Sequence, residues 1–189
     1  MSYVLLFVLV VIVLWGVAAY NGLISLKNQV QNGWTQIDVQ LKRRHDLIPN
    51  LVNTVKGAME YERGTMEAVI AARARAVGAQ GVKATAQAEG ELTQALGKLF
   101  ALMENYPQLK ATANVLQLQE ELTSTENRIG FSRQHYNDVA TEYNTRQQQF
   151  PTSLVAGLAR ATPAELWVIA DAGERAVPQV DLGTRAPGA

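Results

Sequence analysis

Residues 3–20 read YVLLFVLVVIVLWGVAAY, a run of eighteen positions without a charged side chain. At about 1.5 Å per residue, a helix of this length covers roughly 27 Å, close to the roughly 30 Å hydrocarbon core of a bilayer. Leu23, Ile24 and Leu26 can extend the apolar face if the helix tilts. The stretch therefore predicts a transmembrane anchor over residues 1–26, with Trp15 and Tyr20 as anchors at the membrane interface.

A cleaved signal peptide is the competing interpretation of this run. The small residues 16–19, GVAA, would tolerate cleavage. Against this, no Lys or Arg precedes the run, and the run is longer than the usual apolar core of a signal peptide. A lipoprotein anchor would need a cysteine, and the chain has none. A retained membrane anchor is therefore the favoured interpretation, and the lipid bilayer is the first expected partner.

The distribution of positive charge predicts the orientation of the anchor. No basic residue precedes the span, whereas Lys27, Lys42, Arg43, Arg44 and Lys56 follow it. The positive-inside rule then predicts a single-pass protein with its N-terminus outside and its C-terminal part in the cytoplasm. The absence of cysteine fits a reducing compartment.

Beyond the anchor, roughly 165 residues are enough for one domain with a real core. The 17 basic and 17 acidic residues cancel, and no basic stripe occurs. A neutral domain of this kind is a poor candidate for electrostatic binding of nucleic acid, so we expect no nucleic-acid partner.

Apolar residues spaced mostly three or four apart predict a first long helix that continues from the anchor to Gly78. Pro49 interrupts this stripe, since it removes one backbone hydrogen bond and clashes with the carbonyl of His45. Because the stripe keeps its phase across the proline, we expect a kink or a tight restart there. The stripe consists of Leu23, Leu26, Val30, Trp34, Ile37, Leu41, Ile48, Leu51, Val55, Met59, Met66, Val69 and Arg73.

Two further helices are predicted after Gly81. The first covers Ala84–Glu104, with Leu92, Leu96, Leu99 and Met103 on its buried side. The second covers about Gln108–Gln148 and would be roughly 60 Å long, so it must pack against something equally long, most simply the 23–78 segment. Its core positions recur every seven residues: Val115, Leu122, Ile129, Tyr136, Tyr143 and Phe150, with Leu118, Thr125, Ser132 and Val139 in the second position.

The end of the chain has its own pattern. A short amphipathic piece contains Leu154, Val155 and Leu158. Thr162–Glu165 has the form of a capping box with proline at the first helical position, which predicts a short helix over 161–176. Residues 177–189 are rich in Pro and Gly and predict a flexible tail. With residues 27–160 as the bundle, the predicted fold class is all-α: a transmembrane helix followed by an antiparallel, up-and-down four-helix bundle with long helices.

The sequence carries no motif for catalysis. His45 and His135 have neither the Glu-x-x-His nor the His-x-x-x-His spacing of a bundle metal site. Phosphate-binding loops, dinucleotide-binding glycines and nucleophile elbows do not occur, and without cysteine no thiolate can act. We therefore expect no enzyme, no metal and no cofactor.

A line of polar residues lies beside the apolar seam of the 108–148 helix, and we call it the polar ladder. It comprises Glu126, Arg133, Asn137 and Asn144, with Asn127 and Arg128 alongside; the first long helix offers Asp38, Arg43, Arg44, Glu62 and Arg73 near its own seam. One interpretation is a satisfied polar network that fixes the register of two long helices. The other is a groove for a partner peptide or a contact between subunits.

The basic cluster of residues 42–45, KRRH, also allows two interpretations: binding of lipid headgroups, or pairing within the bundle. Arg43 lies 23 residues beyond Tyr20, or roughly 35 Å along a continuous helix, which is several Debye lengths at physiological salt. This distance favours pairing within the bundle.

Taken together, a set of motifs over about residues 20–157 resembles the LemA family of bacterial membrane proteins. The resemblance implies one N-terminal transmembrane helix in the bacterial inner membrane, an outside N-terminus, a cytoplasmic bromodomain-like four-helix bundle and no established enzymatic activity. The region after Pro151, with the predicted 161–176 helix, looks individual to this chain. The motifs are Tyr20-Asn21-x-Leu23, residues 34–51 from Trp34 to Leu51, Glu62, Ala72-Arg73, Tyr106-Pro107-x-Leu109-Lys110, Glu126-Asn127-x-Ile129, Arg133-x-x-Tyr136-Asn137, Tyr143-Asn144 and Phe150-Pro151.

These observations predict a membrane-anchored cytoplasmic bundle that acts as an interaction or assembly scaffold. We expect a homo-oligomer, because roughly 60 Å of seam is more than one short third helix can cover. An accessory or adaptor factor for a membrane enzyme or protease, binding an unknown protein through the polar ladder, is the alternative. A hydrolase would need a concave pocket with converging titratable groups.

Overall fold

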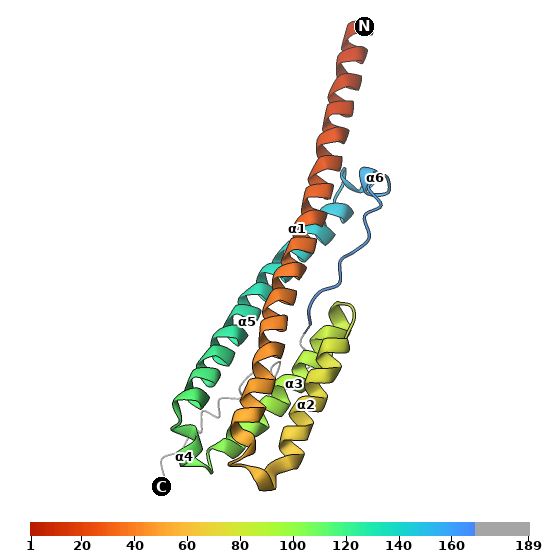
Figure 1. Ribbon diagram of the computed structural model, residues 1–189. Coiled ribbons are helices and arrows are strands. Elements are labelled where there is room, and N and C mark those ends of the chain that lie inside the picture. Colours follow the sequence, from red (N-terminus) through yellow and green to blue (C-terminus); the bar gives the residue numbers. More distant parts are fainter. Residues whose placement is uncertain (169–189) are drawn as a thin grey trace, which may run out of the picture.

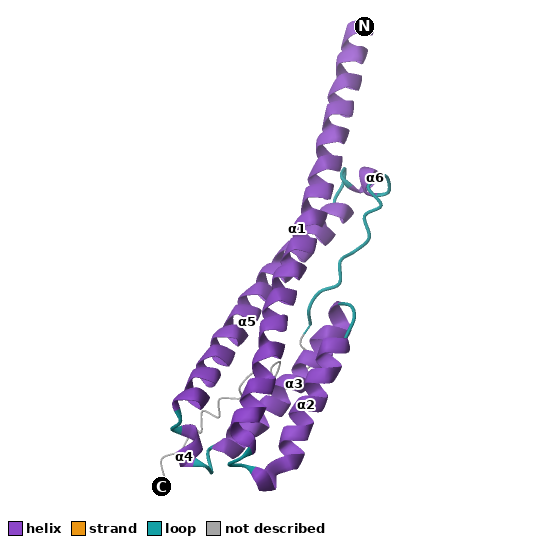
Figure 2. Cartoon of the chain, viewed as in Figure 1, coloured by secondary structure: helices purple, strands orange, loops and turns teal. Residues whose placement is uncertain are grey.

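The structure, a computed structural model, describes residues 1–168 (Figure 1). All regular secondary structure in this range is helical, and Figure 2 shows no strand in it, so the all-α prediction is confirmed for the described part. The elements are α1 (Ser2–Lys56), the 3-10 turn η1 (Glu60–Glu62), α2 (Arg63–Gly78), α3 (Val82–Met103), α4 (Pro107–Lys110), α5 (Ala113–Gln148) and α6 (Ser153–Ala156).

Helix α1 carries both the apolar stretch and a face that packs on α5. Residues 1–15 are exposed throughout, and in Figure 1 this end of α1 projects beyond all the other helices. Within the described range, α1 is long and apolar enough to cross a membrane. Pro49 lies inside α1 without ending it, so no loop interrupts the helix at the proline, as expected.

Helix α5 packs along α1. Residues that lie later on α1 contact residues that lie earlier on α5. Leu23 shares a buried cluster with Tyr143, and Gly33 faces Tyr136. Farther from the apolar end, Arg44 reaches Glu126. Helices α2 and α3 pair with each other beside the lower half of α1 (Figure 1).

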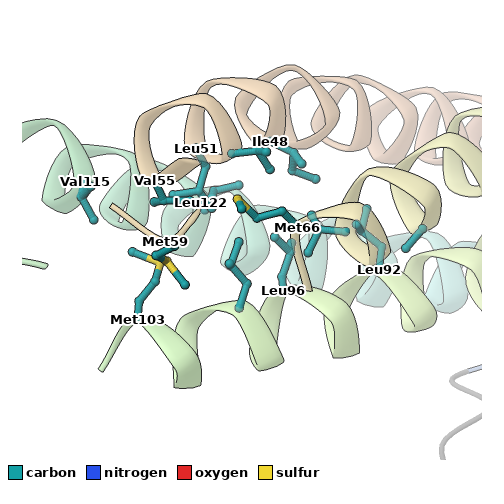
Figure 3. Close-up of a cluster of buried hydrophobic side chains, with 14 of the residues drawn as sticks. Ile48, Leu51, Val55, Met59, Met66, Leu92, Leu96, Met103, Val115 and Leu122 are labelled. Carbon is teal, nitrogen blue, oxygen red and sulfur yellow. The ribbon is translucent and has the colours of Figure 1, made fainter. Parts of the chain in front are cut away.

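The largest buried cluster lies at the end of the helices opposite the apolar stretch. Figure 3 shows side chains from α1, α2, α3 and α5 meeting there, with Met59, Met66 and Met103 among them. Ile48, Leu51, Val55, Leu92, Leu99 and Val115 in this cluster are fully excluded from solvent. The four predicted core positions of the 84–104 helix are all buried, as expected.

The first long helix is shorter than predicted. It ends at Lys56, the chain turns at Gly57–Met59, and a separate helix, α2, begins at Arg63. Gly57 has no side chain to pack, whereas Met59 is fully buried and its amide bonds to the carbonyl of Val55, which turns the chain back toward the core. The apolar stripe therefore belongs to two helices.

The predicted 108–148 helix is interrupted near its start. Helix α4 stops at Lys110, and α5 begins after Thr112, whose hydroxyl donates to the carbonyl of Leu109 at 2.8 Å. The seven-residue seam of α5 is buried from Val115 to Tyr143 as predicted, but Phe150 lies beyond the end of the helix and is 81% exposed.

Residues 161–168 form no helix, so the predicted 161–176 helix is wrong for the part that the structure describes. The segment is extended, and its backbone groups bond to side chains of α5 instead of closing helical turns. The short amphipathic piece before it is the single turn α6, with Leu154 and Leu158 exposed. Residues 169–189, which include the predicted flexible tail, lie outside the described residues.

Candidate functional site

A buried ionic group joins α1 to α3 and α5. The guanidinium of Arg44 lies 3.0 Å from a carboxylate oxygen of Glu89 on α3 and donates to the hydroxyl of Thr93 at 2.8 Å. Its Nη2 also lies 3.0 Å from Glu126 on α5, an ionic contact rather than a well-directed hydrogen bond. Arg44 is only 4% exposed, so these contacts replace water around its charge.

His45 extends this group toward α2. Its Nε2 lies 2.6 Å from the second carboxylate oxygen of Glu89, which is 3% exposed. The backbone carbonyl of His45 accepts a hydrogen bond from Nε of Arg73 at 2.6 Å. We call Arg44, His45 and Glu89, together with the half-buried Glu126, the buried charge cluster; with Arg73 it connects α1, α2, α3 and α5.

The geometry of the buried charge cluster suits a structural role. A buried charge is costly unless a partner and hydrogen bonds compensate for it, so the cluster penalises any register that separates its members. The predicted pairing of the basic segment 42–45 within the bundle is confirmed for Arg44, whereas Lys42 and Arg43 are exposed. Residues 1–168 contain no group of three or more His, Cys, Asp or Glu side chains that could hold a metal ion.

The second site is built by two asparagines of the polar ladder. The side chain of Asn137 donates to the carbonyl of Trp167 at 2.9 Å and accepts from the amide of Trp167 at 2.8 Å. Asn144 makes the same pair of bonds with Ala164, at 2.9 and 2.8 Å. Each asparagine thus satisfies both backbone groups of one residue in the extended segment 161–168.

The spacing of these two pairs follows from helix and strand geometry. Seven residues of helix separate Asn137 from Asn144, a rise of about 10.5 Å. Three residues of extended chain separate Ala164 from Trp167, a rise of about 10 Å. The two elements therefore match in length, and only an extended chain can satisfy both asparagines at once.

An aromatic cage holds the indole of Trp167. The ring lies 6.0 Å from that of Trp34 on α1, and the guanidinium carbon of Arg133 lies 5.8 Å from its centroid, within cation-π range. Tyr136 packs edge-on against Trp34 at 5.7 Å, and its hydroxyl donates to the carbonyl of Glu165 at 2.7 Å. Trp167 is 4% exposed, so it acts as the anchor of the extended segment.

Two tyrosines of α5 titrate differently from a free side chain. Burial raises the pKa of Tyr136, and the Glu165 carboxylate raises it further. Burial alone raises the pKa of Tyr143, whose hydroxyl has no hydrogen-bond partner among the described residues. In both cases the surroundings favour the neutral phenol.

The structure divides the predicted site residues into separate groups. Arg44 and Glu126 join the buried charge cluster, Arg73 bonds to it, and Arg133, Asn137 and Asn144 hold the extended segment, which we call the strap. The remaining residues lie outside both sites: Asp38, Arg43 and Asn127 are exposed, Glu62 is half-buried on η1, and Trp15 and Tyr20 are 37% and 39% exposed on α1. Glu62 and Arg73 do not belong to the first long helix, because that helix ends at Lys56.

The sequence interpretation missed Glu89, Thr93, Trp34 and Trp167 as parts of these sites. For Glu89 a signal was available, because it precedes Leu92 by three residues on the same buried face. For Trp167 the local signal was misleading, because the capping-box pattern predicted a helix. The extended form of this segment depends on its bonds to Asn137 and Asn144 of α5.

Comparison with known proteins matches this chain to one protein family. The model of the LemA family matches residues 33–182, which include the buried charge cluster, both asparagines and the strap. The match extends past Pro151 and covers the strap, a region that the sequence predicted to be individual to this chain. A protein named LemA from Metamycoplasma hominis is 26% identical over 137 residues, which cover 72% of this chain and 63% of that protein.

Magnetosome proteins are also similar. MamQ 2 of Paramagnetospirillum magneticum is 24% identical over 181 residues, covering 82% of this chain and 66% of that protein. MamQ of Magnetospirillum gryphiswaldense is 24% identical over 163 residues, covering 72% of this chain and 60% of that protein. The chain thus spans slightly less than two thirds of the length of these relatives.

Proposed function

Since this chain belongs to the LemA family, we propose that it is a non-catalytic scaffold, anchored in a membrane, on which proteins assemble. Family membership and the apolar end of α1 indicate membrane association. The observation that carries the proposal is the continuity of α1. One uninterrupted helix contains both the exposed apolar stretch and the bundle face that packs on α5.

This continuity has a mechanical consequence. A linker would let the domain tumble, whereas a helix that continues from the span into the core fixes the bundle relative to the membrane. We propose that α1, α2, α3 and α5 form an antiparallel four-helix bundle that stands out from the membrane as a rigid rod. Such a rod suits a scaffold, because its long faces are presented in a defined direction.

We further propose a single span in the bacterial inner membrane, with the N-terminus outside and the bundle in the cytoplasm. The absence of cysteine makes this testable with single substitutions. Tyr61→Cys places a thiol at a position that is 97% exposed in the bundle. A membrane-impermeant maleimide should leave it unlabelled in intact spheroplasts and label it after permeabilisation, whereas Ser2→Cys should be labelled before permeabilisation. Labelling of the Tyr61→Cys protein in intact spheroplasts would refute the orientation.

Assembly is tested by the mass of the full-length protein. Light scattering in detergent, combined with crosslinking in native membranes, should give a uniform homo-oligomer. A monomer in both measurements, with no partner recovered by crosslinking, contradicts the scaffold proposal.

A second candidate, an adaptor that binds an extended segment of another protein, is favoured by the strap. Within the strap, Asn137 and Asn144 bond only to backbone groups, which every peptide offers. Side-chain selection falls to the cage around Trp167. In this proposal the strap occupies the groove until a partner segment with a similar aromatic anchor replaces it.

A labelled peptide of residues 160–168 tests the adaptor candidate. In the full-length Trp167→Ala protein the strap has lost its anchor, so the peptide should bind more tightly than to the unaltered chain. Adding Asn137→Ala and Asn144→Ala should abolish binding, whereas adding the exposed Asn127→Ala should leave it unchanged. If the Trp167→Ala protein does not bind the peptide, the adaptor candidate fails while the scaffold proposal stands.

A further inference from the structure

Large apolar side chains are concentrated on the surface around α6. Outside residues 1–20, the described residues include five large apolar side chains that are more than 60% exposed. Three of them lie within nine residues: Phe150 at 81%, Leu154 at 69% and Leu158 at 75%; the others are Tyr61 and Phe131. We call residues 150–158 the apolar turn. Such a concentration usually marks an interaction surface.

The apolar turn lies beside the end of the apolar stretch of α1. Thr152, inside the turn, lines the same surface hollow as Ala18, Ala19 and Gly22 of α1. These three residues lie within one helical turn of Tyr20, where the apolar stretch ends. Figure 1 shows α6 beside α1 at the level where α1 leaves the bundle. If α1 spans a bilayer, the apolar turn lies at its surface.

The charges around the apolar turn fit this position. Residues 147–160 contain no acidic side chain, and Arg160 follows the turn in an exposed position. Arg146 lines the hollow beside the end of the span, with one acidic neighbour, Glu142. Arginines at this depth can extend to lipid phosphates while apolar neighbours contact the acyl chains.

We propose that the apolar turn is a second membrane contact, in which Phe150, Leu154 and Leu158 enter the interface of the bilayer that α1 spans. This rests on the membrane insertion of α1 proposed above. The chain is then held at two points, the span and the turn at the end of α5. The second point restricts the tilt of the span in the membrane, and with it the tilt of the bundle that continues from the span.

Single-cysteine labelling of the full-length protein tests this contact. Leu154→Cys or Leu158→Cys, labelled with an environment-sensitive fluorophore, is reconstituted in phosphatidylcholine vesicles containing phosphatidylglycerol. We expect blue-shifted emission and quenching by headgroup-proximal nitroxide lipids at least threefold above a Phe131→Cys control. Phe131 is 73% exposed. It lies five residues before Tyr136 on α5, and Tyr136 faces Gly33 of α1. Phe131 is therefore roughly 27 Å from the end of the span along the helix axis.

A label at Val10→Cys separates the two proposals. Val10 lies in the apolar stretch and should be quenched by nitroxides deep in the bilayer. If Val10 is not quenched, the membrane insertion of α1 fails. If Val10 is quenched but both labels in the apolar turn behave like Phe131, or are blue-shifted without lipid quenching, the second contact is refuted and the anchor stands.

A charge substitution completes the test. Leu158→Asp should lower lipid quenching at Leu154→Cys to the level of the Phe131→Cys control, without changing quenching at Val10→Cys. Phe131→Asp is the matched control, since it adds the same charge to an equally exposed apolar site and should change neither label. Unchanged quenching at Leu154→Cys in the Leu158→Asp protein would overturn the proposal.

Discussion

Arg73 donates a hydrogen bond to the carbonyl oxygen of His45, at 2.6 Å, and this is the carbonyl that Pro49 cannot reach. In a regular helix the amide four residues later would bond to this oxygen, but proline has no amide hydrogen. Arg73 lies on α2, so a neighbouring helix supplies the donor that α1 lacks. Packing against α2 therefore satisfies the backbone acceptor that Pro49 leaves open in α1.

The first prediction is that the effect of Arg73 depends on Pro49. Arg73→Ala should lower the free energy of unfolding by about 1.5–3 kcal/mol, the range for a hydrogen bond from a charged group. In a Pro49→Ala background the new amide can bond to the His45 carbonyl, so the same substitution should cost clearly less. Thermal unfolding of the four combinations, followed by circular dichroism in detergent, measures this coupling. An equal loss of unfolding free energy on Arg73→Ala in both backgrounds would contradict the prediction. Arg75→Ala, which removes an exposed pair with Glu91, is the control.

The parts of the fold that the sequence predicted are those that depend on local periodicity. The buried face of α3 and the seam of α5 follow from a 3.6-residue repeat, which one helix shows without reference to its partners. The errors arose where tertiary contacts override a local pattern. Met59 turns the chain into the core where the stripe alone predicted more helix, and Asn137 and Asn144 hold the capping-box segment extended.

The site shows the same division. The polar ladder was recognisable as one face of α5, because residues seven apart share a face. The sequence did not show that the ladder divides into a buried charge cluster and a strap site, because this division depends on which helix faces each residue. Glu89 supplies the carboxylate that joins Arg44 to His45, and the sequence placed no charged partner for them on that helix.

The second prediction compares two glutamates of α3. Glu89→Ala leaves the buried Arg44 without its main partner and should destabilise the protein by about 3–5 kcal/mol, as for a broken buried ion pair. Glu91→Ala removes an exposed pair with Arg75 and should cost less than about 1 kcal/mol. Chemical denaturation of both variants measures the difference. Similar costs would show that the buried charge cluster contributes no more than a surface pair.

The third prediction concerns the attachment of the strap. Asn137→Ala removes both bonds to Trp167, so the segment should detach and the free energy of unfolding should fall by about 1–3 kcal/mol. Hydrogen exchange should accelerate at the amides of Trp167 and Ala164, while amides in the core of α3 stay protected. The exposed Asn127→Ala should leave every exchange rate unchanged. Continued protection of Trp167 in the Asn137→Ala protein would mean that the strap is held by other contacts.

The fourth prediction is an alkaline loss of stability that depends on Tyr143. Burial raises its folded-state pKa above the unfolded value of about 10, so its contribution is complete below that pH and is lost as pH rises through the folded pKa. Tyr143→Phe should therefore reduce the loss of stability above about pH 10. At neutral pH it should be neutral or stabilising by about 1 kcal/mol, because it removes a buried hydroxyl without a partner among the described residues.

Tyr136→Phe is the matched comparison for Tyr143→Phe. Its hydroxyl donates to the backbone carbonyl of Glu165, so its removal should destabilise the protein at neutral pH by about 0.5–1.5 kcal/mol. Unfolding curves at neutral and alkaline pH for both variants measure the contrast. A neutral-pH loss on Tyr143→Phe as large as that on Tyr136→Phe would show that the Tyr143 hydroxyl has a partner after all.

The fifth prediction tests the close approach of α1 and α5 at Gly33. A Cβ at this position would lie 3.4 Å from the Cα of Tyr136, which is ordinary van der Waals contact. Gly33→Ala should therefore be tolerated and can stabilise α1 by up to about 1 kcal/mol through helix propensity. Gly33→Leu has no room for its further atoms and should separate the helices, costing about 1–3 kcal/mol through overpacking. Gly130→Leu is the control, because nothing lies within 4 Å of a Cβ at Gly130. Tyr136 also forms part of the cage around Trp167, so only Gly33→Leu should accelerate hydrogen exchange at the strap. Equal exchange in all three variants would show that this helix contact does not support the strap site.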